Sequence, residues 1–251
     1  MTEKRNRDPS PSPPQFFPPC LGERKWSVLV VALSFLSVIF GTTSSAHDVA
    51  VKDQAFFLHS AGTHIAPFMY LGAKHMVTGY DHLLFLTGVI FFLYRLKDVA
   101  LYVTLFAIGH STTLLLGVLI GIPANPFLID AVIGLSVVYK GFENLDGFQT
   151  LFGWQPNTKA VVLTFGFFHG FGLAAKLQEL NLSDDGLVTN LVSFNIGVEL
   201  GQFAALAFIL VAMNTWRSTG QFVRHARTTN IGLMVCGFVL IGHQLTGYLT
   251  N

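Results

Sequence analysis

Charged residues and cysteines are both scarce in this chain of 251 residues. Asp, Glu, Lys and Arg make up 12% of it, whereas they make up roughly 25% of an average soluble domain. Two cysteines, Cys20 and Cys236, are too few for a disulfide framework or a thiolate metal site. The formal net charge of +1 provides no basic surface for nucleic acid. The composition therefore excludes an ordinary soluble domain and a nucleic-acid-binding protein.

Apolar residues and glycines are abundant instead. Hydrophobic residues make up 51% of the chain, the mean hydropathy is +0.54, and there are 24 Phe and 24 Gly. This mixture is typical of helices that pack closely inside lipid. The sequence therefore predicts an all-α, polytopic helical bundle whose main partner is the lipid bilayer.

The N-terminal 46 residues have the pattern of a signal peptide. Residues 1–25 are polar and Pro-rich and end in Arg24 and Lys25, and an apolar run from Trp26 to Phe40 follows. That run is shorter than the roughly 20 residues of a spanning helix and matches the apolar core of a signal peptide. Small residues before position 47 favour cleavage there; an uncleaved first anchor is the alternative. Both readings place residue 47 on the outer side of the membrane.

Residues 80–251 are expected to form the transmembrane domain. Each of six apolar segments is close to the length that crosses the hydrocarbon core, and helices satisfy their own backbone hydrogen bonds there. The predicted spans are Tyr80–Leu96, Val99–Ile120, Phe127–Leu145, Ala160–Glu179, Leu187–Met213 and Asn230–Leu249.

The basic residues of the connections predict the orientation. Lys and Arg occur after the first, third and fifth spans, whereas the connections at 121–126 and 181–186 have none. By the positive-inside rule the odd-numbered connections are cytoplasmic. We therefore expect a multi-pass protein of the cell (inner) membrane, with the mature N-terminus and the C-terminus on the outer, periplasmic side.

Residues 47–79 precede the first predicted span and are only partly apolar. His59, His64, Lys74 and His75 interrupt the apolar stretches. Such a segment suits the outer membrane interface better than the hydrocarbon core. We expect it to lie on the outer face. Gly79 is a candidate break that would place Asp81 and His82 at a helix N-terminus.

Ionisable and amide side chains recur inside the predicted spans, where each one is costly and needs a partner, a cavity or a function. Imidazole nitrogens and carboxylate oxygens, in the absence of thiolates, are ligands for divalent first-row metals. The candidate metal ligands are His75, Asp81, His82, His110, His169 and Glu199. A second set could serve as a relay or be structural: Glu143, Asn195, Gln202 and His243.

Glycines flank two of these candidates. Gly166 and Gly170 enclose His169, and Gly197 and Gly201 enclose Glu199. This spacing allows two helix backbones to approach closely, so both polar side chains are expected near a helix–helix contact.

Simpler roles remain open for several polar residues. His110 could be an interhelical hydrogen-bonding group, and Lys140 with Glu143, at i and i+3, predicts an ion pair. Asp130 is expected near the outer surface, in contact with solvent.

Four separate segments resemble the HupE/UreJ family of hydrogenase and urease accessory membrane proteins, in particular its UreJ-type branch. They are Gly72–Leu86 with His75, Gly79, Asp81 and His82; Ala107–Leu114; Phe167–Ala174; and Phe194–Gln202, with Tyr139–Leu145 similar to the family's third span. The resemblance implies a signal peptide, about six spans and transport of nickel or cobalt for metalloenzyme maturation. The chain departs from the family motifs at Met76, Leu173 and Lys176.

The expected function is a divalent-metal permease rather than an enzyme. His75, Asp81 and His82 would collect the ion at the outer face, His110, His169 and Glu199 would relay it, and Glu143 would receive it near the cytoplasm. The ion is cargo, so no tightly bound cofactor is expected. The alternatives are a metal-dependent intramembrane hydrolase, a haem protein with His110 and His169 as axial ligands, and a non-transporting assembly partner of a metalloenzyme. A homo-oligomer or a metalloenzyme maturation system are the candidate protein partners.

Overall fold

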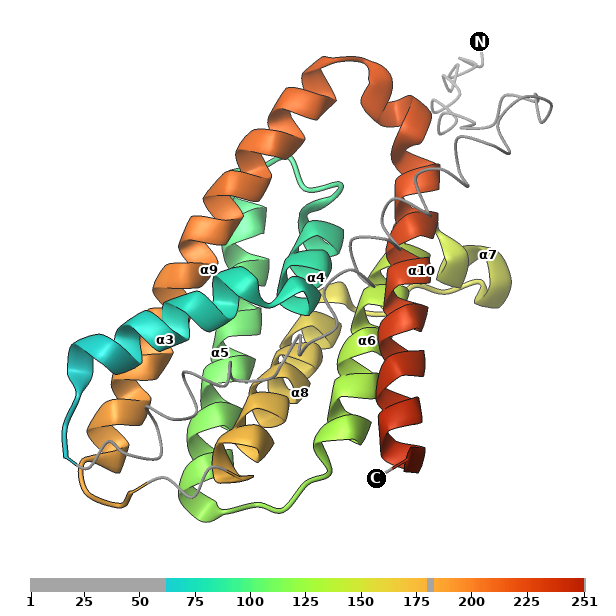
Figure 1. Cartoon of the computed structure of the whole chain (residues 1–251). Coiled ribbons are helices and arrows are strands. Elements are labelled where there is room, and N and C mark those ends of the chain that lie inside the picture. The colour runs from blue at the N-terminus through green and yellow to red at the C-terminus, as the bar shows by residue number, and fades with distance from the viewer. Residues whose placement is uncertain (1–61, 180–182, 251) are drawn as a thin grey trace, which may run out of the picture.

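The computed structural model describes residues 62–179 and 183–250, and this part of the chain is helical with no strand. The signal peptide expected at residues 1–46, and residues 47–61 of the outer segment, lie outside the described residues. The helices, shown in Figure 1, are α3 (Ile65–Thr78), α4 (Tyr80–Ile90), α5 (Leu96–Ile120), α6 (Pro126–Asn144), α7 (Gly147–Phe152), α8 (Thr158–Glu179), α9 (Leu187–Ser218) and α10 (Gln221–Thr250).

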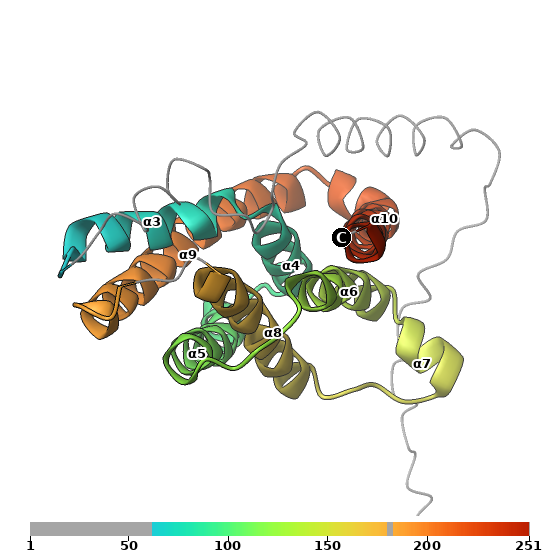
Figure 2. The ribbon, with the colours of Figure 1, turned by 60° about the horizontal axis from the view of Figure 1, so that its bottom comes forward.

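The described helices pack mainly as three pairs around a short one. Helix α3 lies along α9, α5 along α8, and α6 along α10. Helix α4 lies among these pairs and contacts α3, α5, α6, α9 and α10, as the view along the bundle shows (Figure 2). The short helix is therefore the element that joins all three pairs.

Glycines allow the backbones within each pair to touch. A Cβ added to Gly197 of α9 would lie 1.9 Å from the Met69 carbonyl oxygen of α3, and one on Gly170 of α8 would lie 2.0 Å from that of His110 on α5. A Cβ on Gly237 of α10 would lie 2.8 Å from the Gly134 oxygen of α6. No larger residue fits at these positions, so the prediction of close helix contacts at glycines is confirmed.

Within the described residues, four helices are long and apolar enough to cross a membrane: α5, α8, α9 and α10. They correspond to the second, fourth, fifth and sixth predicted spans. Helix α6 has 19 residues but carries Asp130, Lys140 and Glu143, and it is not among the four. The first predicted span, Tyr80–Leu96, is wrong in length, because α4 has only 11 residues and ends at Ile90, fewer than the roughly 17 needed to span.

The chain breaks at Gly79, between α3 and α4, as expected. Gly79 is extended, with φ −71° and ψ 95°, and its N–H donates to the carbonyl oxygen of His75 over 2.9 Å. A Cβ here would lie 2.9 Å from Nδ1 of His82. The break therefore places Asp81 and His82 in the first turn of α4, directly beside the end of α3.

The other end of α4 is capped by a side chain from α9. The last carbonyl groups of a helix have no partner within that helix. Arg217 Nη2 donates to the carbonyl oxygens of Ile90 and Phe91, each over 2.7 Å, and its guanidinium lies 4.5 Å from the ring centre of Tyr94. Arg217 thus anchors the C-terminal end of α4 to the C-terminal end of α9.

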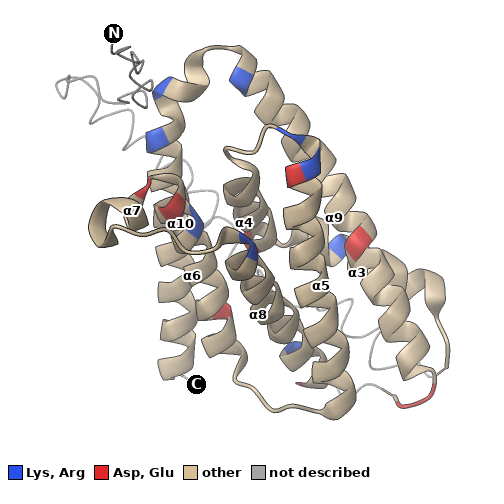
Figure 3. Ribbon diagram, turned by 180° about the vertical axis from the view of Figure 1, so that it is seen from behind, with Lys and Arg blue, Asp and Glu red and all other residues tan. Residues whose placement is uncertain are grey.

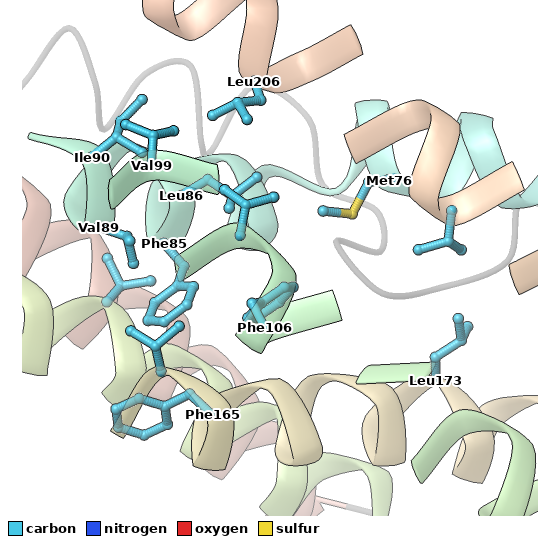
Figure 4. Packing of buried hydrophobic residues seen from close by; sticks show 14 of the residues in the cluster. Met76, Phe85, Leu86, Val89, Ile90, Val99, Phe106, Phe165, Leu173 and Leu206 are labelled. Carbon is cyan, nitrogen blue, oxygen red and sulfur yellow. The ribbon is translucent and has the colours of Figure 1, made fainter. Parts of the chain in front are cut away.

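Aromatic side chains fill the interior beside α4. The Phe85 ring lies 5.3 Å from that of Phe106 and 5.9 Å from that of Phe165, measured between centroids, and Figure 4 shows these rings among the buried apolar residues. The outward faces are also apolar, with Phe203, Phe208 and Val211 of α9 among the exposed residues. An apolar exterior over long helices is consistent with a membrane protein.

Charged residues are few and are unevenly distributed (Figure 3). Arg95 and Lys97 lie between α4 and α5 or at the start of α5, and Arg217, Arg224 and Arg227 lie beside the α9–α10 turn. These five basic residues are therefore gathered at one end of the bundle, whereas Lys176 lies in the last turn of α8, near the other end.

We predict that Gly197→Ala destabilises the protein, because the new Cβ would overlap the Met69 carbonyl of α3. Overpacking of this kind costs about 1–3 kcal/mol, so the melting temperature of the detergent-purified variant should fall. Gly232→Ala of α10 is the control, since nothing lies within 4 Å of the added Cβ, and alanine favours a helix. Equal melting temperatures for the two variants would contradict the packing described here.

Candidate metal centre

Three histidines from three helices meet beside the α3–α4 break. His75 of α3, His82 of α4 and His110 of α5 each place one ring nitrogen so that all three atoms lie within 4.8 Å of one another. His82 and His110 are buried, with 0% and 1% of their surface exposed. We call these residues the histidine cluster.

Two further candidates lie against the cluster. The His169 ring of α8 is 5.0 Å from that of His82 between centroids, and His169 is fully buried. Asp81 is also buried, and its Oδ1 lies 3.1 Å from Nδ1 of His82. Five of the six predicted ligands are therefore brought together from α3, α4, α5 and α8.

Hydrogen bonds orient two of the imidazoles. His82 Nδ1 faces the Asp81 carboxylate, and His169 Nδ1 lies 2.8 Å from the carbonyl oxygen of Phe165. Because both partners are acceptors, each Nδ1 donates, and Nε2 is the ring nitrogen that could bind a metal ion. A ring held in this tautomer by a carboxylate or a carbonyl is the usual arrangement of a metal-binding histidine.

His110 is unusual because both of its ring nitrogens are buried without a hydrogen-bond partner among residues 62–179 and 183–250. Leaving a buried polar group unpaired costs about 1–3 kcal/mol. The interpretation of His110 as an interhelical hydrogen-bonding group therefore has no support in these residues. A bound cation would satisfy one of the two nitrogens.

The close contact of α5 and α8 positions His110 and His169. A Cβ on Gly166 would lie 2.5 Å from the Phe106 carbonyl oxygen, and Gly170 meets His110 itself. Residues three apart on a helix differ by about 60° around the axis, so His169 lies close to the glycine face. The same small residues that bring the helices together thus direct this imidazole inward.

Glu199 does not join the histidine cluster, contrary to expectation. Its side chain is exposed, while Gly197 and Gly201 face α3. Glu199 follows Gly197 by two residues, which is about 200° around a helix, so it points away from the contact. Glycine spacing predicted the contact correctly but the direction of this side chain wrongly.

Two of the four residues expected to act as a relay, Glu143 and Gln202, form hydrogen bonds away from the histidine cluster. Glu143 forms the predicted ion pair with Lys140 and also accepts from Thr158 and Gln155; it lines a separate cavity of about 1100 Å³ between α4, α6 and α10. Gln202 donates to the Val103 carbonyl oxygen over 3.2 Å.

The two remaining relay candidates differ in burial. His243 is exposed on α10, whereas Asn195 is 9% exposed and its Oδ1 has no hydrogen-bond partner in the described part of the chain. The structure therefore gives no continuous relay through these side chains.

Sequence reasoning missed a buried ion pair. Asp130 was expected in contact with solvent, but it is 4% exposed, and its Oδ2 accepts from Lys176 Nζ of α8 over 2.7 Å. The available signal was one charge of each sign near the same end of two predicted spans. That expectation for Asp130 is wrong because α6 and α8 pack side by side.

The donor set of the histidine cluster suits a divalent transition metal. Neutral imidazoles with a carboxylate bind zinc, copper, nickel, cobalt and iron, whereas calcium and magnesium prefer oxygen ligands alone. The buried thiol of Cys236 lies on α10, a helix that contributes no residue to the histidine cluster. The residues of the cluster offer ligand atoms that could hold a metal ion.

A family model described as HupE / UreJ protein matches residues 51–251. The match includes the whole helical bundle and every residue of the candidate metal centre. Neither the search of curated proteins nor that of solved structures found a match.

We predict that His110→Leu leaves the metal-free protein as stable as wild type or more stable, because an apolar side chain removes two unpaired buried nitrogens. Stabilisation by added Ni²⁺ or Co²⁺ should be lost; a ligand at 100 times its Kd stabilises by about 2.7 kcal/mol. Melting temperatures with and without metal measure both effects.

The matched control is His243→Leu, at an exposed histidine of α10, which should retain the metal-induced shift. A His110→Leu variant that melts lower than wild type and still responds fully to metal would contradict a ligand role for His110.

Proposed function

The chain belongs to the HupE/UreJ family, and on this basis we propose that it is an integral membrane permease for divalent transition-metal ions. Nickel and cobalt are the proposed ions. The family is one of accessory and transport proteins, so the proposal assigns no catalytic residue. The ion is substrate rather than resident cofactor.

The convergence of His75, His82 and His110 carries the proposal. Three imidazoles from three helices are costly to bury together, and His110 comes from a later segment of the chain than His75 and His82. Their ring nitrogens within 4.8 Å of one another are close enough to share one ion, since metal–imidazole bonds of about 2 Å put ligand nitrogens about 3–4 Å apart. Small rearrangements of the rings would complete the coordination.

The chemistry of the cluster favours passage over permanent retention. Imidazole and carboxylate ligands bind nickel and cobalt less tightly than thiolates bind soft metals. Asp81 is the carboxylate beside the cluster, and it is engaged with His82. We propose that Asp81 orients His82 and supplies the negative charge that compensates the ion.

We also propose an orientation and a path. The end of the bundle with Arg95, Lys97 and Arg217 would face the cytoplasm by the positive-inside rule, and both chain termini of the mature protein would lie outside. Helix α6 would cross as a further span, because its three charged side chains are paired: Asp130 with Lys176 and Lys140 with Glu143. Cleavage before residue 47 remains part of the proposal.

Uptake of radiolabelled Ni²⁺ or Co²⁺ tests the proposal in cells that express wild type or His82→Ala. His82 lies within ring-contact distance of His75, His110 and His169, so its loss should reduce accumulation to the level of cells without the protein. His225→Ala is the control. His225 is exposed near the start of α10, so cells that express this variant should accumulate metal like wild type. Equal accumulation by His82→Ala and wild type would contradict the proposed permease function.

Proteoliposomes separate a permease from an assembly partner. Purified wild type should carry Co²⁺ to a chelating dye trapped inside the vesicles, at a rate that saturates with metal concentration. A protein that binds cobalt but produces no flux would be an assembly partner instead.

A further inference from the structure

Asp130 and Lys176 form a buried ion pair between α6 and α8. Lys176 Nζ donates to Asp130 Oδ2 over 2.7 Å, and the two side chains are 16% and 3% exposed. The ammonium is thus partly accessible from the surface, whereas the carboxylate is enclosed. Removing two charges from water is costly and is repaid only when both groups are fully hydrogen-bonded.

One of the two carboxylate oxygens of Asp130, Oδ1, takes no part in this ion pair. Its Oδ1 is buried and has no hydrogen-bond partner among the residues that the structure describes. Gly172 of α8 lies beside it, and a Cβ there would lie 3.2 Å from Oδ1. An oxygen with unused lone pairs therefore faces a position at which the sequence has no side chain.

The pair lies two helical turns along α8 from His169, which packs against the histidine cluster. Lys176 follows His169 by seven residues, which is two helical turns, or about 10 Å along one face. His169 is itself in ring contact with His82, so Lys176 of the ion pair lies on the same helix as a histidine that packs against the cluster.

The pair is also on the side that the proposed orientation assigns to the outside. Asp130 is in the second turn of α6, which begins at Pro126, and Lys176 is in the last turn of α8, which ends at Glu179. An ion that moves from this end toward His169 would pass the Asp130 carboxylate first.

We propose that Asp130 is an entry-side ligand for the metal and that Lys176 is a built-in counter-cation which the metal displaces. This inference rests on the proposed function and adds a ligand to it. Without metal, the Lys176 ammonium neutralises the buried carboxylate. An arriving divalent ion replaces it, and the flexible lysine side chain moves its strongly hydrated charge to the nearby surface.

A purely structural ion pair predicts something different. If the pair only ties α6 to α8, neutralising both side chains would alter stability but not metal affinity. If Asp130 is a ligand, its carboxylate contributes to affinity whether or not Lys176 is charged. The two interpretations therefore differ in binding and not merely in folding.

The experiment measures the Kd of detergent-purified protein for Co²⁺ by isothermal titration calorimetry. The central comparison is Lys176→Gln against Asp130→Asn/Lys176→Gln, because these variants differ only in the carboxylate. Lys176→Gln should bind at least as tightly as wild type, since the competing cation is gone. The double variant should bind roughly ten- to a hundredfold more weakly than the single one, as expected for loss of a group at a metal site.

One control and one alternative comparison complete the design. Arg95→Gln/Asp98→Asn removes an exposed ion pair beside the start of α5 and should leave the Kd unchanged. Where Lys176→Gln is too unstable to purify because Asp130 is left unpaired, the neutral double variant is compared directly with wild type, and weaker binding is again expected.

The outcomes separate the two proposals. Equal Kd values with and without the Asp130 carboxylate, together with loss of binding in His82→Ala, would overturn the ligand role of Asp130 and leave the proposed function standing. Absence of Co²⁺ binding by wild type would overturn both.

Discussion

The contact of helix backbones at glycine is the constraint on which the metal centre depends. At Gly170 an added Cβ would lie 2.0 Å from the carbonyl oxygen of His110, so the backbones of α5 and α8 touch here, and Thr113 Oγ1 of α5 donates to the Phe167 carbonyl oxygen of α8 over 2.7 Å. This contact sets the depth and the facing of His110 and His169 simultaneously. The backbones of α3 and α9 also touch, at Gly197. His75 of α3 lies beside His82 and His110. Small residues thus act on the site without contributing a ligand.

The break at Gly79 brings His75 and His82 closer together than one straight helix could. A continuous helix would carry His75 and His82 on one face but would separate them by about 10 Å, two turns along its axis. With the break, their rings are 5.2 Å apart between centroids. Arg217 then holds the far end of α4 through two backbone carbonyls. Helix α4 is therefore a short, doubly anchored element, and its first turn presents Asp81 and His82 to the histidines of α3, α5 and α8.

Sequence reasoning predicted the all-helical fold, the break at Gly79 and the close contacts of the glycines, because these follow from composition and local spacing. Four of the expected spans are helices of spanning length. It failed where tertiary packing decides the outcome. Helix α4 ends at Ile90, short of the expected span, Glu199 is turned outward by its place two residues after Gly197, and Asp130 is buried against α8. Periodicity identifies a helix face, but which face meets which neighbour follows from the packing of all the pairs.

The central claim is that one ion is shared by imidazoles from several helices. The X-ray absorption spectrum of nickel-loaded, purified protein at the nickel K edge tests it most directly. The account predicts a nearest shell of nitrogen and oxygen with the outer-shell scattering of at least three imidazoles, one each from His75, His82 and His110. A shell that contains sulfur, or oxygen alone without imidazole scattering, would contradict it.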